Sequence, residues 1–257
     1  MKKYLRILGV GAATLLLLTA CEGNLFMGLG IGQPGEPNTS KTPENDNEAL
    51  GLIDEIESYY FSSGGSDEET QEYVGALEDI YNSESSDISS ETKQKAAITA
   101  SRIELDSNDE AKDVINNIVD SIDEIMETED SGGGEGSEYE FLLGMLPDNE
   151  EDFDTAYEGM AAASEHFKAF ADELENGEPV DLEGDEAEVA FQAAISLLLT
   201  AGNDEDPPLI EYDDDGPYIN EDFKENEFDP DKNDTLGAAE TVLEWGFPDM
   251  ADELFGE

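Results

Sequence analysis

An acidic segment near the C-terminus, DPDKNDTLGAAE at 229–240, spaces its side-chain oxygens in a way that suits a hard metal ion. Asp229, Asp231 and Asn233 alternate along the chain, and Glu240 adds a carboxylate that can bind through both of its oxygens. Calcium prefers oxygen ligands of this kind. The segment therefore predicts a Ca²⁺ site with these four side chains as its ligands.

The same spacing resembles the calcium loop of the EF-hand family. That loop has oxygen ligands at its first, third and fifth positions, an aliphatic residue at the eighth, here Leu236, and a glutamate at the twelfth. The segment departs from the family at the sixth position, where Asp234 replaces the usual glycine, and no clear helix precedes it. The alternative is an Asx-rich turn that caps the last helix.

Cys21 is the only cysteine, and it follows a basic start and an apolar run over residues 7–18, which is the layout of a secretory signal peptide. The tetrapeptide Leu18-Thr19-Ala20-Cys21 resembles the lipobox of bacterial lipoproteins. The resemblance implies cleavage after Ala20, lipidation of the Cys21 thiol and acylation of the new N-terminus, which together would anchor the protein to a membrane. The alternative is a signal peptide with a chance cysteine, or a buried helix end.

The residue after the cysteine bears on the destination. It is Glu22, whereas the inner-membrane retention signal of some Gram-negative bacteria is an aspartate. We therefore expect an exported, membrane-anchored lipoprotein that faces the periplasm or the cell surface, on the outer membrane if the organism has one.

The charge of the chain narrows the classes of function. The chain has 67 acidic and 11 basic residues, and removal of the predicted signal peptide takes away three of the basic ones, so 8 remain against 67 acids, a formal charge of −59. Direct binding of nucleic acid would need a basic surface, and none is visible. Disorder fits poorly with 38% hydrophobic residues at helical spacing. A halophile-type surface, whose repulsion molar salt screens, is the remaining interpretation.

Hydrophobic periodicity predicts an all-α domain at 48–257, after a signal peptide at 1–20 and a lipidated cysteine with a flexible tether at 21–47. We expect about 7–9 helices in an irregular bundle or in stacked α-hairpins, and a tetratricopeptide-like stack is one form of the latter. Capping boxes are expected at Ser66–Glu69 and Ser107–Glu110. The expected core positions are Ala49, Leu52, Ile53, Ile56 and Tyr60; Tyr73, Leu77 and Ile80; Ala96, Ala97, Ala100 and Ile103; Ala111, Val114, Ile118, Ile122 and Ile125; and Phe153, Tyr157, Met160, Ser164, Phe167, Ala171 and Leu174.

Three segments carry more specific expectations. The two helices within 89–128 are separated by few residues and should pack as an antiparallel hairpin. The segment 186–201 is apolar nearly all round, which predicts a central helix capped by Asp185 and closed by Gly202. Beyond it, 203–233 has no period apart from short extended pieces near 209–212, and a last helix is expected at 235–245.

Catalytic chemistry has few candidates, and we name no catalytic residue. His166 is the only histidine, lies just off the apolar stripe of its helix, and is interpreted as a boundary-packing or surface residue. Lys93, Lys95, Arg102 and Lys112 gather within twenty residues. They form either an anion-binding face or, more simply, ion pairs with neighbouring acids.

These observations favour a lipid-anchored cell-envelope protein that acts as a non-enzymatic binding or scaffolding module. Its partners would be the membrane, through lipidated Cys21, and another envelope protein, but not nucleic acid. Alternatives are a calcium-binding envelope protein that uses the 229–240 loop, and a periplasmic accessory subunit of a transporter. A carboxylate-based enzyme is the third alternative, after the calcium-binding protein.

Overall fold

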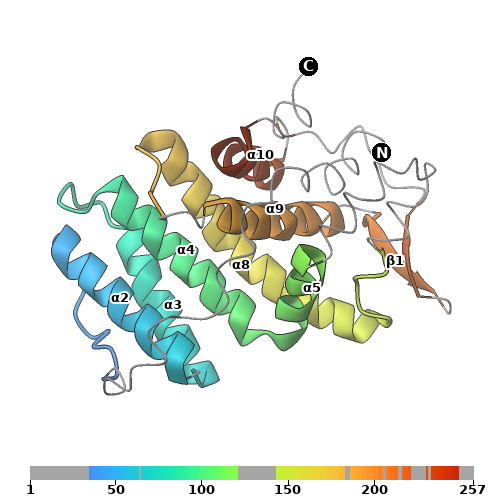
Figure 1. The fold of residues 1–257 in the computed structure, drawn as a ribbon, viewed down its shortest axis with the longest axis horizontal. Coiled ribbons are helices and arrows are strands. Elements are labelled where there is room, and N and C mark those ends of the chain that lie inside the picture. Colours follow the sequence, from blue (N-terminus) through green and yellow to red (C-terminus); the bar gives the residue numbers. More distant parts are fainter. Residues whose placement is uncertain are drawn as a thin grey trace.

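A computed structural model describes residues 35–63, 65–120, 143–182, 186–204, 207–213, 216–220, 230 and 233–248. Within these ranges the fold is all-α, as predicted, with seven helices and one two-stranded sheet (Figure 1). The helices are α2 (Asp46–Ser63), α3 (Asp67–Tyr81), α4 (Ser90–Ser107), α5 (Asp109–Asp120), α8 (Glu150–Asn176), α9 (Glu186–Asn203) and α10 (Asp234–Gly246), and the strands are β1 (Ile210–Asp213) and β2 (Gly216–Ile219). No helix in the described part of the chain has both the length and the apolar character to span a bilayer.

The helices surround two hydrophobic clusters that share α4. The smaller cluster joins α2, α3 and one face of α4, where Ala96, Ala100 and Ile103 are buried. The larger cluster takes the other face of α4, including Ala97 and Leu105, together with α5, α8, α9 and α10. Figure 1 shows α4 between these two groups of helices. The apolar stripes predicted for α2, α3, α4 and α8 all face these clusters.

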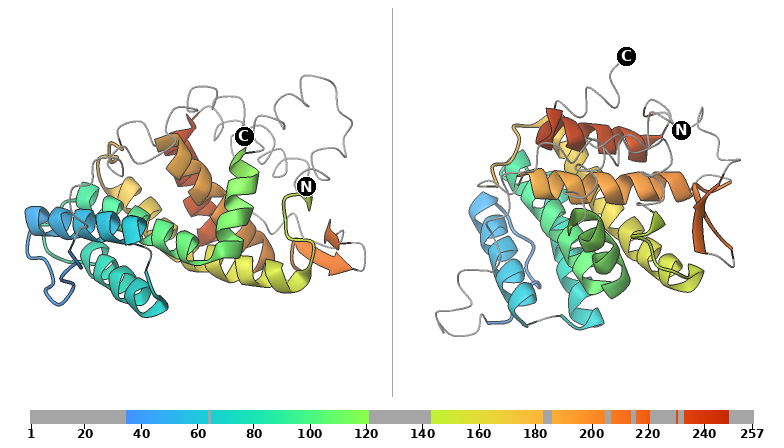
Figure 2. Two further views of the ribbon diagram at one scale, coloured as in Figure 1. Left: turned by 60° about the horizontal axis from the view of Figure 1, so that its bottom comes forward. Right: turned by 45° about the vertical axis from the view of Figure 1, so that its right-hand side comes forward.

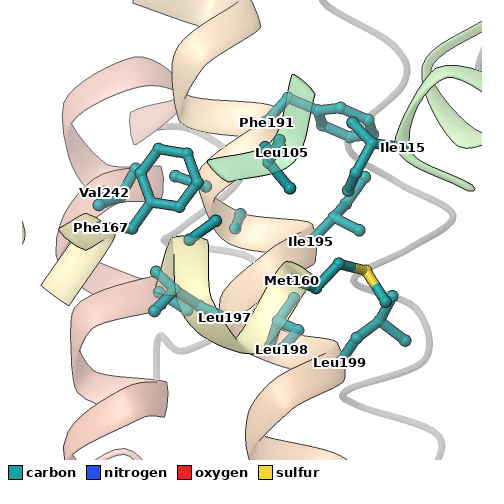
Figure 3. Packing of buried hydrophobic residues seen from close by; sticks show 14 of the residues in the cluster. Leu105, Ile115, Met160, Phe167, Phe191, Ile195, Leu197, Leu198, Leu199 and Val242 are labelled. Carbon is teal, nitrogen blue, oxygen red and sulfur yellow. The ribbon is translucent and has the colours of Figure 1, made fainter. Parts of the chain in front are cut away.

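Helix α9 is the centre of the larger cluster, as its composition predicts. From Val189 to Ala201 every side chain is buried except Gln192, which is half-buried. Figure 3 shows side chains of α4, α5, α8 and α10 packed around it. The expectation that Gly202 ends this helix is wrong, because the helix continues to Asn203. A Cβ on Gly202 would lie 2.9 Å from Cδ2 of Leu209, so the glycine allows a close approach of the following segment. Asp185, the expected cap, lies outside the described residues.

The two predicted capping boxes have different outcomes. At α3 the box is complete: Ser66 accepts a hydrogen bond from the backbone N–H of Glu69, whose carboxylate accepts one from the N–H of Ser66. The second box is wrong, because Ser107 is the last residue of α4 and donates its hydroxyl to the carbonyl of Glu104. Asn108 caps α5 instead, and its Oδ1 accepts from the N–H of Ala111 at 2.8 Å.

The expected antiparallel hairpin of α4 and α5 does not form. Only Asn108 separates the two helices, and α5 leaves α4 at a steep angle (Figure 2, left). Its buried residues Val114, Ile115 and Ile118 join the cluster of α8 and α9. The physical reason is that these apolar side chains are buried against α8 and α9 in the larger cluster, and not against α4 alone. Ile122 and Ile125 lie outside the described residues.

The non-helical segment 35–45 packs against the folded domain ahead of α2. Pro37 and Pro43 are buried, and the hydroxyl of Thr39 donates to Glu72 on α3. The folded part of the chain therefore includes residues that precede the first described helix.

Candidate functional site

A cleft of about 420 Å³ opens between the beginning of α8, the end of α9 and strand β1. In Figure 1 the strands lie beyond the end of α9, beside the beginning of α8. The residues that form its wall are Glu150, Phe153, Asp154, Tyr157, Asn203, Pro208, Ile210, Glu211 and Tyr212. Its volume falls in the range of small-molecule sites.

The α8 wall follows from how that helix begins. Asn149 is the N-cap, and its side-chain oxygen accepts a hydrogen bond from the N–H of Asp152 at 3.0 Å. Counted from Glu150, the residues three, four and seven positions later share one helix face. Those residues are Phe153, Asp154 and Tyr157, so the helix presents alternating carboxylates and rings to the cleft.

The opposite wall is held by backbone and side-chain hydrogen bonds to α9. The N–H of Leu209 donates to the carbonyl of Gly202 at 2.9 Å, and the N–H of Ile210 donates to Oδ1 of Asn203 at 3.1 Å. Strand β1 then pairs with β2, with Ile210 opposite Ile219. This arrangement brings the ring of Tyr212 to α8.

Three aromatic rings lie together in the cleft. The centroid of the Phe153 ring is 5.3 Å from that of Tyr212 and 6.4 Å from that of Tyr157. Both tyrosine hydroxyls are already bonded, because Tyr212 donates to the carbonyl of Pro147 at 3.0 Å and Tyr157 donates to Asp204. The tyrosines are half-buried, so they offer ring surface rather than free hydroxyl groups.

Carboxylates border these rings. Glu150 and Asp154 are exposed one helical turn apart, whereas Glu211 accepts hydrogen bonds from the Tyr218 hydroxyl at 2.6 Å and from Asn220 Nδ2 at 2.8 Å. Burial raises the pKa of the Tyr212 phenol, and the negative charges of Asp154, Asp148 and Glu150 raise it further. The cleft therefore has a negative potential at its aromatic surface.

No described lysine or arginine neutralises this charge. The six basic residues within the described ranges all form ion pairs with other acids. The four predicted either to bind anions or to pair with acids do the latter: Lys93 with Glu173, Lys95 with Glu91, Arg102 with Glu57 and Lys112 with Asp106. Two of them, Arg102 and Lys112, line a second, smaller cleft of about 210 Å³.

The sequence patterns did not predict the aromatic cleft. Its α8 face was assigned to the core through Phe153 and Tyr157, and the extended residues 209–212 were predicted without a partner strand. The available signal was the alternation of acid and ring over 150–157, followed by Tyr212 in an extended segment. Their proximity depends on the path of the chain between α8 and β1, which local periodicity does not specify.

The predicted calcium ligands are divided between described and undescribed parts of the chain. Asp229 and Asp231 lie outside the described residues. Asn233 is the N-cap of α10 and accepts hydrogen bonds from the N–H groups of Thr235 and Leu236 at 3.0 and 3.2 Å. Asn233 therefore caps α10, the last helix, as the alternative prediction of a capping turn expected. Glu240 is half-buried on α10. No group of three metal-ligating side chains occurs within the described ranges, and the Ca²⁺ site stays a prediction.

The other two candidate residues are Cys21 and His166. Cys21 lies outside the described residues, so its lipidation stays a prediction. His166 is 4% exposed, and its Nδ1 lies 2.9 Å from the hydroxyl oxygen of Tyr81. Burial lowers the pKa of His166 to about 4, and the nearby charge of Glu165 opposes that shift. His166 therefore packs between α3 and α8, as the boundary-packing alternative predicted, and the surface alternative is wrong.

Comparison of the chain with protein-family models, with curated proteins and with solved structures found no match.

Proposed function

We propose that this protein is a non-enzymatic binding module of the bacterial cell envelope, anchored by lipid at Cys21, and that the cleft between α8 and β1 is its binding site. One observation carries the proposal: an open cleft of about 420 Å³ with three adjacent rings, built where α8, α9 and the β-hairpin meet. Sites for small molecules are typically concave, with aromatic surface and few polar groups.

The cleft favours binding over catalysis. Among the described residues, its wall contains no histidine, cysteine, serine or lysine. Glu150 and Asp154 are exposed, whereas an acid catalyst at neutral pH depends on a carboxyl group withdrawn from water. His166, the one imidazole, is buried against Tyr81 and is not part of the cleft wall.

The anchor is supported by sequence. The order of basic start, apolar run and Leu18-Thr19-Ala20-Cys21 resembles the export and lipidation signal of bacterial lipoproteins. An acidic surface suited to a salty medium is consistent with export. Another envelope protein is the expected partner, and an accessory subunit of a transporter would use such a cleft in the same setting.

A fluorine NMR experiment tests the binding site. The full chain, produced in a bacterium with 3-fluorotyrosine and purified in detergent, carries one fluorine reporter at each tyrosine that remains after processing. Tyr157→Phe and Tyr212→Phe assign the two cleft signals. Mixtures of small metabolites are then added, and the proposal expects these two signals to shift first. Shifts spread evenly over all tyrosines, or none with any mixture, would contradict it.

The anchor has a separate test. The full chain and its Cys21→Ser variant are expressed with radiolabelled palmitate. The expected result is radiolabel on the wild-type chain and none on the variant. Equal labelling of the wild-type chain and the variant would contradict the lipid anchor and would not affect the proposal for the cleft.

A further inference from the structure

We infer that the ligand of the cleft is a small organic cation, an alkylammonium group on an aliphatic body, held between the rings of Tyr157 and Tyr212 and the carboxylates of Glu150 and Asp154. This inference rests on the proposed function, because it names the class of ligand for the same cleft.

The two tyrosines of the cleft wall offer a ligand ring surface rather than free hydroxyl groups. The hydroxyls of Tyr157 and Tyr212 are bonded to Asp204 and to the carbonyl of Pro147. These two phenols therefore have no proton left to donate to a neutral ligand. Ring faces attract cations through their quadrupole, and aromatic sites that recognise methylated ammonium groups use this attraction.

The carboxylates of the cleft wall favour a ligand of positive charge. Glu150 and Asp154 lie four residues apart on α8, a spacing at which like charges repel. Neither has an ion-pair partner among the described residues, because every described lysine and arginine pairs elsewhere. Glu211 adds a third carboxylate, which Tyr218 and Asn220 fix in place. A cationic ligand relieves this repulsion, whereas an anion would increase it.

The aromatic rings distinguish this cleft from the acidic surface as a whole. Carboxylates elsewhere attract inorganic cations through charge alone, and molar salt screens that attraction. Here the carboxylates border a group of three rings with centroids 5.3 and 6.4 Å apart. Rings favour an alkylammonium group over a strongly hydrated metal ion, because the alkyl body also loses contact with water.

The experiment uses the full chain in detergent and molar NaCl, with choline as the probe. Its neutral isostere, 3,3-dimethylbutan-1-ol, has the same shape without the charge, and ammonium ion has the charge without the body. Titration calorimetry should give choline an affinity at least about tenfold above that of either control compound. A second arm with putrescine distinguishes a quaternary from a primary ammonium ligand, and tighter binding of either one than of the controls supports the inference.

Matched variants locate the binding. Asp154→Asn should weaken choline binding at least about threefold, whereas Glu158→Gln, which removes one charge from an exposed position of α8 outside the cleft wall, should change it by less than about twofold. Tyr212→Leu should weaken it about fivefold or more. Asp154→Asn alters only an exposed helix position, so it keeps the test valid if Tyr212→Leu fails to fold.

Two results would overturn the inference: neither choline nor putrescine binds more tightly than the control compounds, or Asp154→Asn and Glu158→Gln weaken binding equally. The fluorine signals of Tyr157 and Tyr212 then show which claim has failed. If a neutral compound moves them, the cleft is a binding site and only the cationic class is wrong. If no compound moves them, the proposed function itself is wrong.

Discussion

The hydroxyl oxygen of Tyr81 lies 2.9 Å from Nδ1 of His166, and this contact joins α3 to α8 where the two hydrophobic clusters meet. Tyr81 packs against both clusters, and the two rings meet edge to face at 5.9 Å. Either group can be the donor in this contact, because the phenol hydroxyl both donates and accepts and the role of Nδ1 depends on the tautomer of the ring. The contact therefore places a buried titratable group between the two helices.

Acid should weaken the fold through His166. Its pKa is lowered by burial to about 4, from 6.5 for an ordinary histidine. Between these two pH values the unfolded chain binds a proton that the folded chain does not. The contribution of His166 to the free energy of unfolding is therefore fully present above about pH 6.5 and is lost as the pH falls towards 4. The shift corresponds to at most about 3 kcal/mol of unfolding free energy. Urea unfolding of the wild-type chain and of His166→Gln across this range measures it.

The variant is needed because many carboxylates titrate in the same window. Glu165, Glu78 and Glu104 all lie near this contact. Burial, and then the charges of Glu78 and Glu165, raise the pKa of Tyr81, and burial with the charge of Glu78 raises that of Glu104. Glutamine retains a polar contact to Tyr81 without a proton to bind. The wild-type profile should therefore fall more steeply than that of the variant, and two parallel profiles would show that His166 contributes nothing.

Gly159 on α8 should not tolerate a methyl group. A Cβ at this position would lie 2.7 Å from Cβ, Cγ and Nδ2 of Asn108. Asn108 cannot move away freely, because it caps α5 and donates from Nδ2 to the carbonyl of Thr155 at 2.9 Å. We expect Gly159→Ala to lower the unfolding free energy by about 1–3 kcal/mol.

A glycine without such a neighbour provides the control. Gly51 is exposed within α2, and a Cβ there would have no atom within 4 Å. Gly51→Ala should therefore stabilise the protein by about 0.5–1 kcal/mol through helix propensity. Thermal unfolding measures both variants. Stabilisation by Gly159→Ala as well would mean that α5 and α8 are not in the close contact described here.

Local sequence patterns predicted most of the helices, because each helix buries a stripe that recurs at its own period. The five apolar positions of α2 and the Ser66 capping box are examples in which one segment contains the whole signal. The corner at Asn108 was missed because Ser107 also fits a capping pattern, and only the packing of α5 on α8 decides between them. The cleft was missed for a related reason, since Tyr212 meets Phe153 across nearly sixty intervening residues.

Gln94 is a fully buried polar residue that ties α4 to the end of α8. Its Nε2 lies 3.2 Å from the carbonyl of Glu173 and 2.9 Å from that of Glu178, and its Oε1 accepts from the N–H of Val180 at 2.8 Å. Gln94→Glu keeps the shape, but it replaces a donor to two carbonyls with an acceptor. The expected loss of unfolding free energy is about 2–4 kcal/mol.

Gln71→Glu makes the same change at an exposed position of α3 and separates this effect from added charge. Denaturant unfolding of the two variants should give a small loss for Gln71→Glu and a large one for Gln94→Glu. Similar losses in both would mean that net charge, and not the buried hydrogen bonds, determines the result.

Salt should stabilise the fold over the range from low to molar NaCl. The chain has 67 acidic residues and only 11 lysines and arginines to pair with them. Repulsion between the remaining carboxylates falls as the screening length drops to about 3 Å at molar ionic strength. We expect the melting temperature of the wild-type chain, followed by circular dichroism, to rise by at least about 5 °C. A double variant on the exposed side of α2, Asp54→Asn with Glu55→Gln, should show a smaller rise. The double variant is the control, and a rise equal to that of the wild-type chain would contradict the electrostatic explanation. Calcium at about 2 mM adds little ionic strength, so a large rise at that dose would instead support the Ca²⁺ site predicted for 229–240.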